Sequence, residues 1–278
     1  MGSTARDLTG KVALVTGSSR GIGRVIATHL ASRGASVAIH GTSPFSSRAF
    51  NEADSLEAVA SAIAAETASL VFPVSGDLTT EESVKRVVGD VRARFSRIDI
   101  LVNCAGGDIG AAGTGGPGGG MPSPNDCVRV SFPDIKAVLD RNLMSCILVC
   151  REVAPEMMER REGRVVNISS GAAFIGQENE AIYSVAKAGV VEYTRCLAAQ
   201  LRKYNVMVNT VAPGAIPTAR FVATRPTDES KMLTGGTLDR YGWPIEIARA
   251  VGFLVSEDAT FITGQVLRVD GGSQLFPA

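Results

Sequence analysis

The sequence lacks several features that would point to particular classes of partner. Lysine plus arginine equal aspartate plus glutamate at 28 each, so no excess of positive charge favours nucleic acid or an anionic membrane surface. No apolar run is long enough to cross a bilayer, and residues 1–11 contain no hydrophobic signal segment. We therefore expect a soluble, cytoplasmic protein whose partner is a small molecule.

Metal-binding and redox motifs are also missing. The chain has two histidines and five cysteines, and no two cysteines form a Cys-x-x-Cys pair. Cys146 and Cys150 share a face of an expected helix, but no histidine or further cysteine lies near them in the sequence. We predict no metal site, and thiols that are reduced and mostly buried.

What the chain does contain is an alternation of apolar, strand-like stretches with helix-like stretches. This pattern predicts a parallel sheet with helices on both faces. We expect one Rossmann-type, doubly wound α/β domain of about seven strands over residues 1–278, without repeats or linkers. The expected strands are 11–16, 36–40, 70–74, 98–103, 164–168, 206–211 and 265–269, and the expected helices are 22–33, 53–66, 81–95, 133–161, 183–203 and 244–255.

Three connecting segments are longer than this pattern requires. Residues 42–52 lengthen the connection after the second strand, and residues 106–125 are rich in glycine and proline. The composition of 106–125 predicts a mobile loop that buries little, which is either a substrate lid or a passive insertion. Residues 218–238 are the other expected lid; the apolar Phe221, Met232 and Leu233 there fit either a pocket lining or a helix core.

The glycine-rich stretch from Gly17 to Gly23 has two functional interpretations. Between a strand and a helix, it allows the backbone to approach a pyrophosphate at the helix amino terminus. The spacing Gly-x-Ser-x-Gly around Ser19 also matches the nucleophile turn of α/β-hydrolases. That turn requires upstream strands and a late histidine, whereas the two histidines are His29 and His40. The sequence therefore favours a dinucleotide site.

A possible proton-transfer group follows the fifth expected strand. Tyr183 and Lys187 are four residues apart, which places them on one helix face. An ammonium beside the phenol, together with a bound cationic nicotinamide, favours the phenolate and would lower the tyrosine pKa. Ser170 lies just beyond a strand end, where open α/β sheets bind ligands. These three residues predict acid–base chemistry at one edge of the sheet.

Taken together, the motifs carry a family resemblance. They are TGSSRGIG from Thr16, Asp77-Leu78, NCAG from Asn103, Asn142 in LDRNL, Ser170 with Tyr183-x-x-x-Lys187, PGAIPT from Pro213, and GQVLRVDGG near the end. In this order and spacing the chain resembles the short-chain dehydrogenase/reductase family over essentially its whole length. The similarity is greatest to the subgroup that includes 3-oxoacyl-acyl-carrier-protein reductases.

The resemblance implies roles for individual residues. Tyr183 would be the general acid, Ser170 would hydrogen-bond the substrate oxygen, Lys187 would hold the nicotinamide ribose, and Asn142 would hold a water that relays protons. Asp77 would contact adenine, although alone it could equally cap the following helix. The implied cofactor contacts are Gly17, Ser19, Arg20, Gly21, Ile22, Gly23, Gly41, Thr42, Asp77, Leu78, Asn103, Ala105, Gly106, Tyr183, Lys187, Pro213, Gly214, Ile216 and Thr218.

The nucleotide preference is argued from two places in the chain. The second expected strand ends in His40-Gly41-Thr42-Ser43, with no carboxylate to accept from ribose hydroxyls. Arg20 lies within the glycine-rich turn, where its guanidinium could reach a 2′-phosphate. We therefore expect NADP(H) to be favoured over NAD(H).

The expected function is NADPH-dependent reduction of a ketone to a secondary alcohol, with a 3-oxoacyl thioester as the favoured substrate. One alternative is a sugar, polyol or xenobiotic alcohol dehydrogenase or carbonyl reductase using NAD(P). Another is a dinucleotide-binding sensor or scaffold without turnover, against which the complete set of site residues argues. The family resemblance also implies a homotetramer, with a homodimer as the other possibility.

Overall fold

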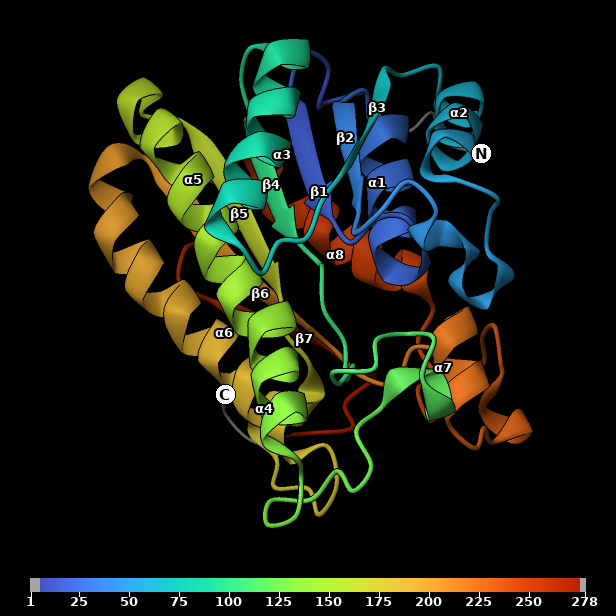
Figure 1. Ribbon diagram of the computed structural model, residues 1–278. Helices are drawn as coiled ribbons and strands as arrows, with labels where there is room; N and C mark the ends of the chain where they lie inside the picture. The colour runs from blue at the N-terminus through green and yellow to red at the C-terminus, as the bar shows by residue number, and fades with distance from the viewer. Residues whose placement is uncertain (1–5, 276–278) are drawn as a thin grey trace.

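A seven-stranded, entirely parallel sheet organises the chain, as shown by the computed structural model in Figure 1, which describes residues 6–275. The strand order β3-β2-β1-β4-β5-β6-β7 confirms the predicted doubly wound architecture. Residues 1–5 and 276–278 of the predicted domain lie outside the described part. The strands are β1 (Val12–Thr16), β2 (Ser36–Gly41), β3 (Val71–Ser75), β4 (Ile100–Asn103), β5 (Gly163–Ile168), β6 (Val206–Pro213) and β7 (Val266–Val269).

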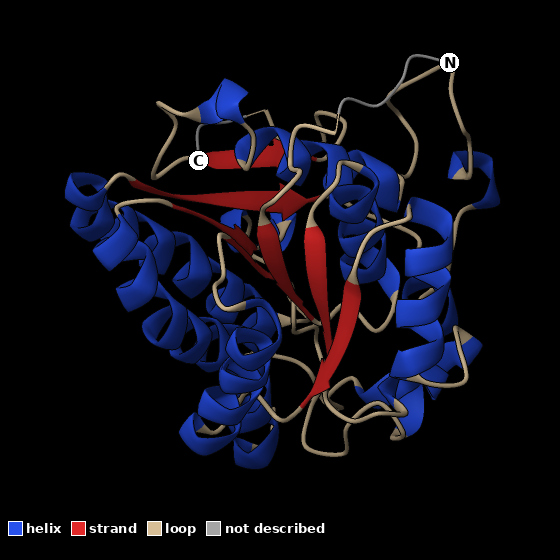
Figure 2. Cartoon of the chain, turned by 90° about the horizontal axis from the view of Figure 1, so that it is seen from above, coloured by secondary structure: helices blue, strands red, loops and turns tan. Residues whose placement is uncertain are grey.

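Helices cover both faces of the sheet, which Figure 2 shows from above. One layer contains α1 (Gly21–Ser32), α2 (Leu56–Thr67) and α8 (Pro244–Leu254), which share an apolar core with the strands. The opposite layer contains α3 (Glu81–Phe95), α5 (Ser145–Arg160) and α6 (Ala181–Leu201), around a second core. Every residue of β1, β4 and β6 is buried, which explains why these strands are mostly apolar and do not alternate between apolar and polar residues.

The predicted helix over 133–161 is present, and it contains a π-helical turn that the sequence did not predict. The chain forms α4 (Phe132–Leu139), a π-helical turn (Asp140–Met144) and then α5. Within the turn, Asn142 Nδ2 donates to Val138 O at 2.8 Å and to Gly107 O at 2.9 Å. We attribute the interruption to this contact with a distant loop, since π-turns accompany a local change in the backbone hydrogen-bond pattern.

The connections over residues 42–52 and 106–125 contain local structure and buried residues. Residues 42–52 contain a 3-10 turn (Ser46–Asn51), and α2 begins only after Ser55, whose side chain caps its first turn. In the 106–125 segment, Asp108, Ile109 and Asn125 are buried, so the prediction that this segment buries little is wrong. It lies beside the short helix α7 (Ala219–Thr224), as Figure 1 shows.

No helix among residues 6–275 is both long and apolar enough to cross a membrane.

A buried histidine connects the glycine-rich turn to the neighbouring strand ends. His40 is 1 % exposed; its Nδ1 accepts from Gly17 N at 3.2 Å, and its Nε2 lies 3.0 Å from Gly76 O. Because the Gly17 amide can only donate, Nδ1 carries no proton and Nε2 donates to Gly76. Burial lowers the pKa of His40 to about 4. The neutral ring is therefore part of the folded structure.

We predict that His40 makes the protein less stable as the pH falls. Its ordinary pKa is about 6.5, so the unfolded chain takes up a proton below that pH while the folded chain does so only near 4. The expected loss of unfolding free energy between these values is about 3 kcal/mol. Urea unfolding at several pH values measures it. In His40→Gln, which can also accept and donate, this part of the pH dependence should disappear; an unchanged pH profile would contradict the assignment.

Candidate active site

The glycine-rich turn lies against the backbone that follows β4. A Cβ atom on Gly17 would lie 2.6 Å from Ala105 Cα, and one on Gly23 would lie 2.4 Å from Gly17 O. Thr16 Oγ1 accepts from Cys104 N at 3.0 Å and from Ala105 N at 3.1 Å, which holds the two segments together. Only residues without side chains allow the turn to lie this close to the neighbouring backbone at these two positions.

A cleft of about 1010 Å³ extends from this turn across the carboxyl ends of the strands. The turn at one end and the Tyr183 region at the other suit the two halves of a dinucleotide and a substrate. The predicted site residues that line the cleft are Gly17, Ser19, Arg20, Gly21, Ile22, Gly23, Gly41, Thr42, Asp77, Leu78, Ala105, Gly106, Ser170, Tyr183, Lys187, Pro213, Gly214, Ile216 and Thr218. Asn103 and Asn142 are absent from this lining.

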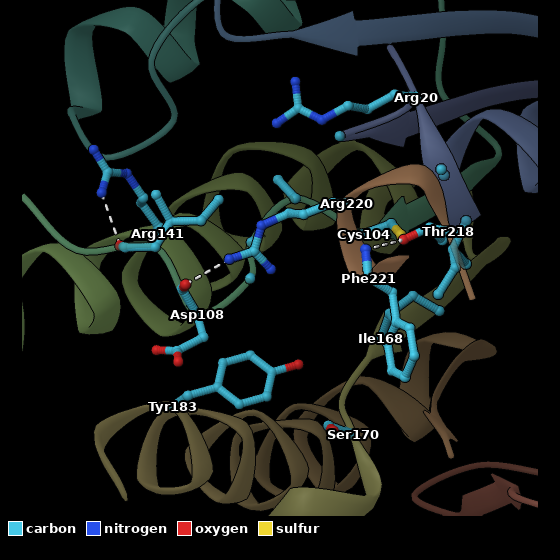
Figure 3. Close-up of a pocket in the computed structure, with 18 of the residues that line it drawn as sticks. Arg20, Cys104, Asp108, Arg141, Ile168, Ser170, Tyr183, Thr218, Arg220 and Phe221 are labelled. Atoms are coloured by element: carbon cyan, nitrogen blue, oxygen red, sulfur yellow. Dashed lines mark hydrogen bonds between the residues drawn. The ribbon is translucent and has the colours of Figure 1, made fainter. Parts of the chain in front are cut away.

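Ser170, Tyr183 and Lys187 come together where β5 ends and α6 begins. Ser169, at the end of the strand, donates to Lys187 O at 2.8 Å and so joins the two elements. Lys187 is buried; its Nζ donates to Ile168 O at 2.9 Å and lies 5.7 Å from the centre of the Tyr183 ring. Figure 3 shows Ser170 and Tyr183 on the same wall of the cleft.

Among the protein's own side chains the net shift of the Tyr183 pKa is upward, so the predicted lowering is wrong for them, and the lowering expected from a bound nicotinamide stays a prediction. Burial raises the pKa of Tyr183, and the hydrogen bond with Ser170 counteracts this shift. Burial also lowers the pKa of Lys187. Desolvation therefore keeps the phenol protonated near neutral pH, which suits a group that donates a proton.

Two asparagines predicted at the site lie behind it. Asn142 bonds both backbone groups of Gly107: its Oδ1 accepts from the amide and its Nδ2 donates to the carbonyl, each at 2.9 Å. Its side chain therefore positions the loop at the cleft, and its role in holding a water stays a prediction. Asn103 is buried, and its Nδ2 donates to Asn167 Oδ1 at 2.9 Å. Its side chain faces the core instead of the predicted cofactor.

A carboxylate that the sequence argument did not consider lies at the first turn of α1. Glu52 Oε2 accepts from Gly21 N at 2.9 Å, and its Oε1 is buried without a hydrogen-bond partner in the described part of the chain. The same loop also contacts Arg20 of the glycine-rich turn: Arg20 Nη1 donates to Ser46 O at 2.5 Å. An irregular loop gives no periodic signal, so its sequence could not show that Glu52 returns to the turn.

The structure distinguishes between the interpretations that the sequence left open for Asp77 and for the apolar residues of the expected lid. Asp77 accepts from Thr79 N at 3.0 Å and lines the cleft, whereas Thr80 caps α3. Phe221 also lines the cleft, and its ring meets that of Tyr241 edge to face. Met232 and Leu233 do not line the cleft, so the interpretation that they line an apolar pocket is wrong.

Comparison with known proteins assigns the family. A family model described as enoyl-(acyl carrier protein) reductase matches residues 17–274. The chain belongs to the short-chain dehydrogenase/reductase family. It is 38 % identical over 265 residues to a 3-oxoacyl-[acyl-carrier-protein] reductase of Aquifex aeolicus, covering 95 % of this chain and 98 % of the relative. The corresponding protein of Escherichia coli is 34 % identical, over 96 % and 98 % of the two chains.

Solved structures of the short-chain dehydrogenase/reductase family agree with this assignment. A 7α-hydroxysteroid dehydrogenase complexed with NADH and a 7-oxo bile acid superposes with a TM-score of 0.81 at 31 % identity, covering 98 % of this chain and 97 % of the other. A family member from Mycobacterium ulcerans gives 0.80 at 29 % identity, over 95 % and 90 % of the chains. The protein is an NAD(P)-dependent oxidoreductase that acts on CH–OH or C=O groups.

We predict that Gly23→Ala weakens cofactor binding because its methyl group would displace the carbonyl of Gly17. The expected effects are a roughly tenfold or greater rise in the Kd for NADPH and a loss of about 1–3 kcal/mol in unfolding free energy. Nicotinamide fluorescence and urea unfolding measure the two quantities.

Gly89→Ala is the matched control for this substitution. Gly89 lies within α3 with no atom within 4 Å of an added Cβ, so alanine should stabilise the helix by roughly 1 kcal/mol and leave binding unchanged. Unaltered NADPH binding by Gly23→Ala would show that the close approach does not shape the cofactor site.

Proposed function

We propose that the protein reduces a ketone to a secondary alcohol, using NADP(H) as the hydride donor and Tyr183 as the general acid. The observation that carries the proposal is that Ser170, Tyr183 and Lys187 line the same cleft as the glycine-rich turn. A structural role alone would not require these side chains to converge on one cleft. The complete set also argues against the alternative of a sensor or scaffold.

The chain's own groups divide the remaining chemistry. A bound nicotinamide supplies the hydride. Tyr183 donates its proton to the carbonyl oxygen as that oxygen gains negative charge, and Ser170 donates a hydrogen bond to the same oxygen. Lys187 provides a buried positive charge near the phenol, which stabilises the phenolate left after proton transfer. Asn142 keeps Gly107 in place beside these groups.

The preference for NADP(H) depends on a balance of charges at the adenosine end. Arg20, Thr42 and Ser43 line that end and offer a guanidinium and two hydroxyls to a 2′-phosphate. Glu52 lines it too, and its carboxylate would repel a second anion. We propose that the arginine outweighs this repulsion and that Glu52 limits the preference.

The relatives suggest the first substrate class to test. The proteins of Aquifex aeolicus and Escherichia coli are 3-oxoacyl-[acyl-carrier-protein] reductases, which supports a 3-oxoacyl thioester. Sugar, polyol or xenobiotic alcohols are the alternative class, which is favoured by the charged side chains near Tyr183, including Asp108 and Arg220. A homotetramer remains a prediction from the family resemblance, and a cytoplasmic location remains a prediction from the sequence composition.

We predict that Tyr183→Phe reduces kcat by about 100-fold or more, because proton transfer by a positioned group contributes that much. The Kd for NADPH should stay within about twofold, since the ring is kept. NADPH oxidation with 3-oxoacyl thioesters and with polyol-derived ketones measures the first, and fluorescence the second. Tyr204→Phe, outside the cleft, is the control. Full turnover in Tyr183→Phe would refute the assigned role.

We predict that Glu52→Gln shifts the preference further toward NADPH by roughly tenfold, because it removes a negative charge beside the 2′-phosphate position. The ratio of the dissociation constants for NADH and NADPH measures the shift. Glu57→Gln, an exposed change on α2, should leave the ratio unaltered. A ratio that stays constant or falls in Glu52→Gln would mean that the carboxylate does not oppose the phosphate.

A further inference from the structure

Charged side chains surround the part of the cleft next to Tyr183. The lining there includes Arg220, Arg225, Asp108 and Glu180. An alkyl chain placed against these groups would remove them from water without giving them partners, which is costly. This wall therefore suits a polar or charged portion of a substrate better than a plain acyl chain.

Two of the arginines that line the cleft already form an ion pair or hydrogen bonds with other groups of the protein. Arg225 forms an ion pair with Glu180 at 2.5 Å. Arg141 Nη1 donates to the carbonyl oxygens of Ile109 and Gly110 in the neighbouring loop. Both side chains therefore have partners within the protein and do not require a ligand.

Arg220 differs from these two. Its Nη2 donates to the backbone oxygen of Asp108 at 2.6 Å, but its Nε is buried without a hydrogen-bond partner, and it forms no ion pair with any carboxylate among residues 6–275. Burial lowers the pKa of Arg220, and the nearby charge of Arg225 adds to this shift. A guanidinium stays protonated in proteins, so a half-buried cation remains here without an ion pair in the described part of the chain.

The acid beside Arg220 forms no ion pair with it in the described structure. Asp108 is buried, its Oδ2 accepts from Asn125 Nδ2 at 2.6 Å, and its Oδ1 has no hydrogen-bond partner in the described structure. Burial raises the pKa of Asp108, and the hydrogen bond with Asn125 counteracts this shift. The carboxylate of Asp108 therefore bonds Asn125, and Arg220 donates to the backbone oxygen of Asp108 instead.

The position of Arg220 connects it to the reacting group. Figure 3 shows its guanidinium between Arg20 and Tyr183, with Asp108 next to the tyrosine. Both Asp108 and Arg220 interact electrostatically with Tyr183. An anionic group bound to Arg220 would consequently lie on a molecule that also reaches the phenol.

We propose that the substrate carries a carboxylate close to its reacting carbonyl and that Arg220 binds this carboxylate. The proposal rests on the ketone reduction proposed above and narrows its substrate class to keto acids, or to 3-oxoacyl thioesters whose acyl chain ends in a carboxylate. Arg220 also lies near enough to Arg20 for their charges to interact, so the cofactor diphosphate is the other anion that it could serve.

The test compares keto acids with their neutral methyl esters. The probes are 4-oxopentanoate and 5-oxohexanoate, each with its ester, titrated calorimetrically into the enzyme saturated with NADP⁺. The oxidised cofactor cannot reduce a ketone, so binding is read without turnover. The wild type should bind at least one acid about 30-fold more tightly than its ester, the range expected for a desolvated charge pair.

Three variants test whether Arg220 causes this preference for the acid over the ester. Arg220→Met should bind acid and ester equally, whereas Arg220→Lys should keep part of the preference because it keeps the charge but loses the planar donor pair. Arg129→Met removes an exposed arginine outside the cleft and should leave the ratio at the wild-type value. The thermal unfolding midpoint of each variant shows whether the fold is retained.

Equal binding of acid and ester by the wild type, including no detectable binding of either, would overturn the proposal. So would an unchanged acid-to-ester ratio in both Arg220 variants; if their Kd for NADP⁺ rose at the same time, the guanidinium would serve the cofactor diphosphate. Failure of the proposed function appears separately, as absence of NADPH oxidation with every ketone, charged or neutral, while the binding ratio remains readable.

Discussion

The backbone of the glycine-rich turn lies in contact with the backbone that follows β4, and the candidate site depends on that contact. Gly17 has no room for a side chain against Ala105, and Thr16 fixes the spacing by accepting from two successive amides. His40 binds the turn from the other side through its neutral ring. The turn is thus held by protein groups on both sides. The first turn of α1 lines the cleft without help from a ligand, with Glu52 accepting from its first amide, so the position of the turn is preorganised.

The fold could be predicted because its information is local. Continuous apolar runs predicted buried parallel strands, and each run corresponds to one, with ends shifted by a few residues. The π-helical turn at 140–144 could not be predicted in the same way. It accompanies the bond between Asn142 and Gly107, 35 residues apart, and no helical periodicity encodes that contact. The direction of the Tyr183 pKa shift failed for a similar reason, since spacing shows a neighbouring lysine but not the burial of both side chains.

The site divides into a part that motifs describe and a part that they do not. The turn, Ser170, Tyr183 and Lys187 belong to recognisable patterns on regular elements, and the sequence placed them correctly in one cleft. Glu52, Asp108 and Arg220 come from the 42–52 loop, the 106–125 loop and α7. Their positions follow from tertiary contacts of two irregular loops and one short helix, which local sequence cannot specify. The motif-bearing part is compatible with many ketones, so selectivity must come from the second part.

Buried polar atoms without hydrogen bonds have a thermodynamic meaning in this second part. Glu52 Oε1, Asp108 Oδ1 and Arg220 Nε are all buried without a hydrogen bond in the described structure, and all three side chains line the cleft. Each such group lowers folding stability, and an apolar side chain of similar volume would avoid that cost. A ligand that supplies the missing partners recovers this free energy on binding, whereas one of the wrong charge does not. These groups therefore lower the folding stability but favour ligands that pair with them over ligands that do not. Glu52 has this effect at the nucleotide end of the cleft, and Arg220 has it at the substrate end.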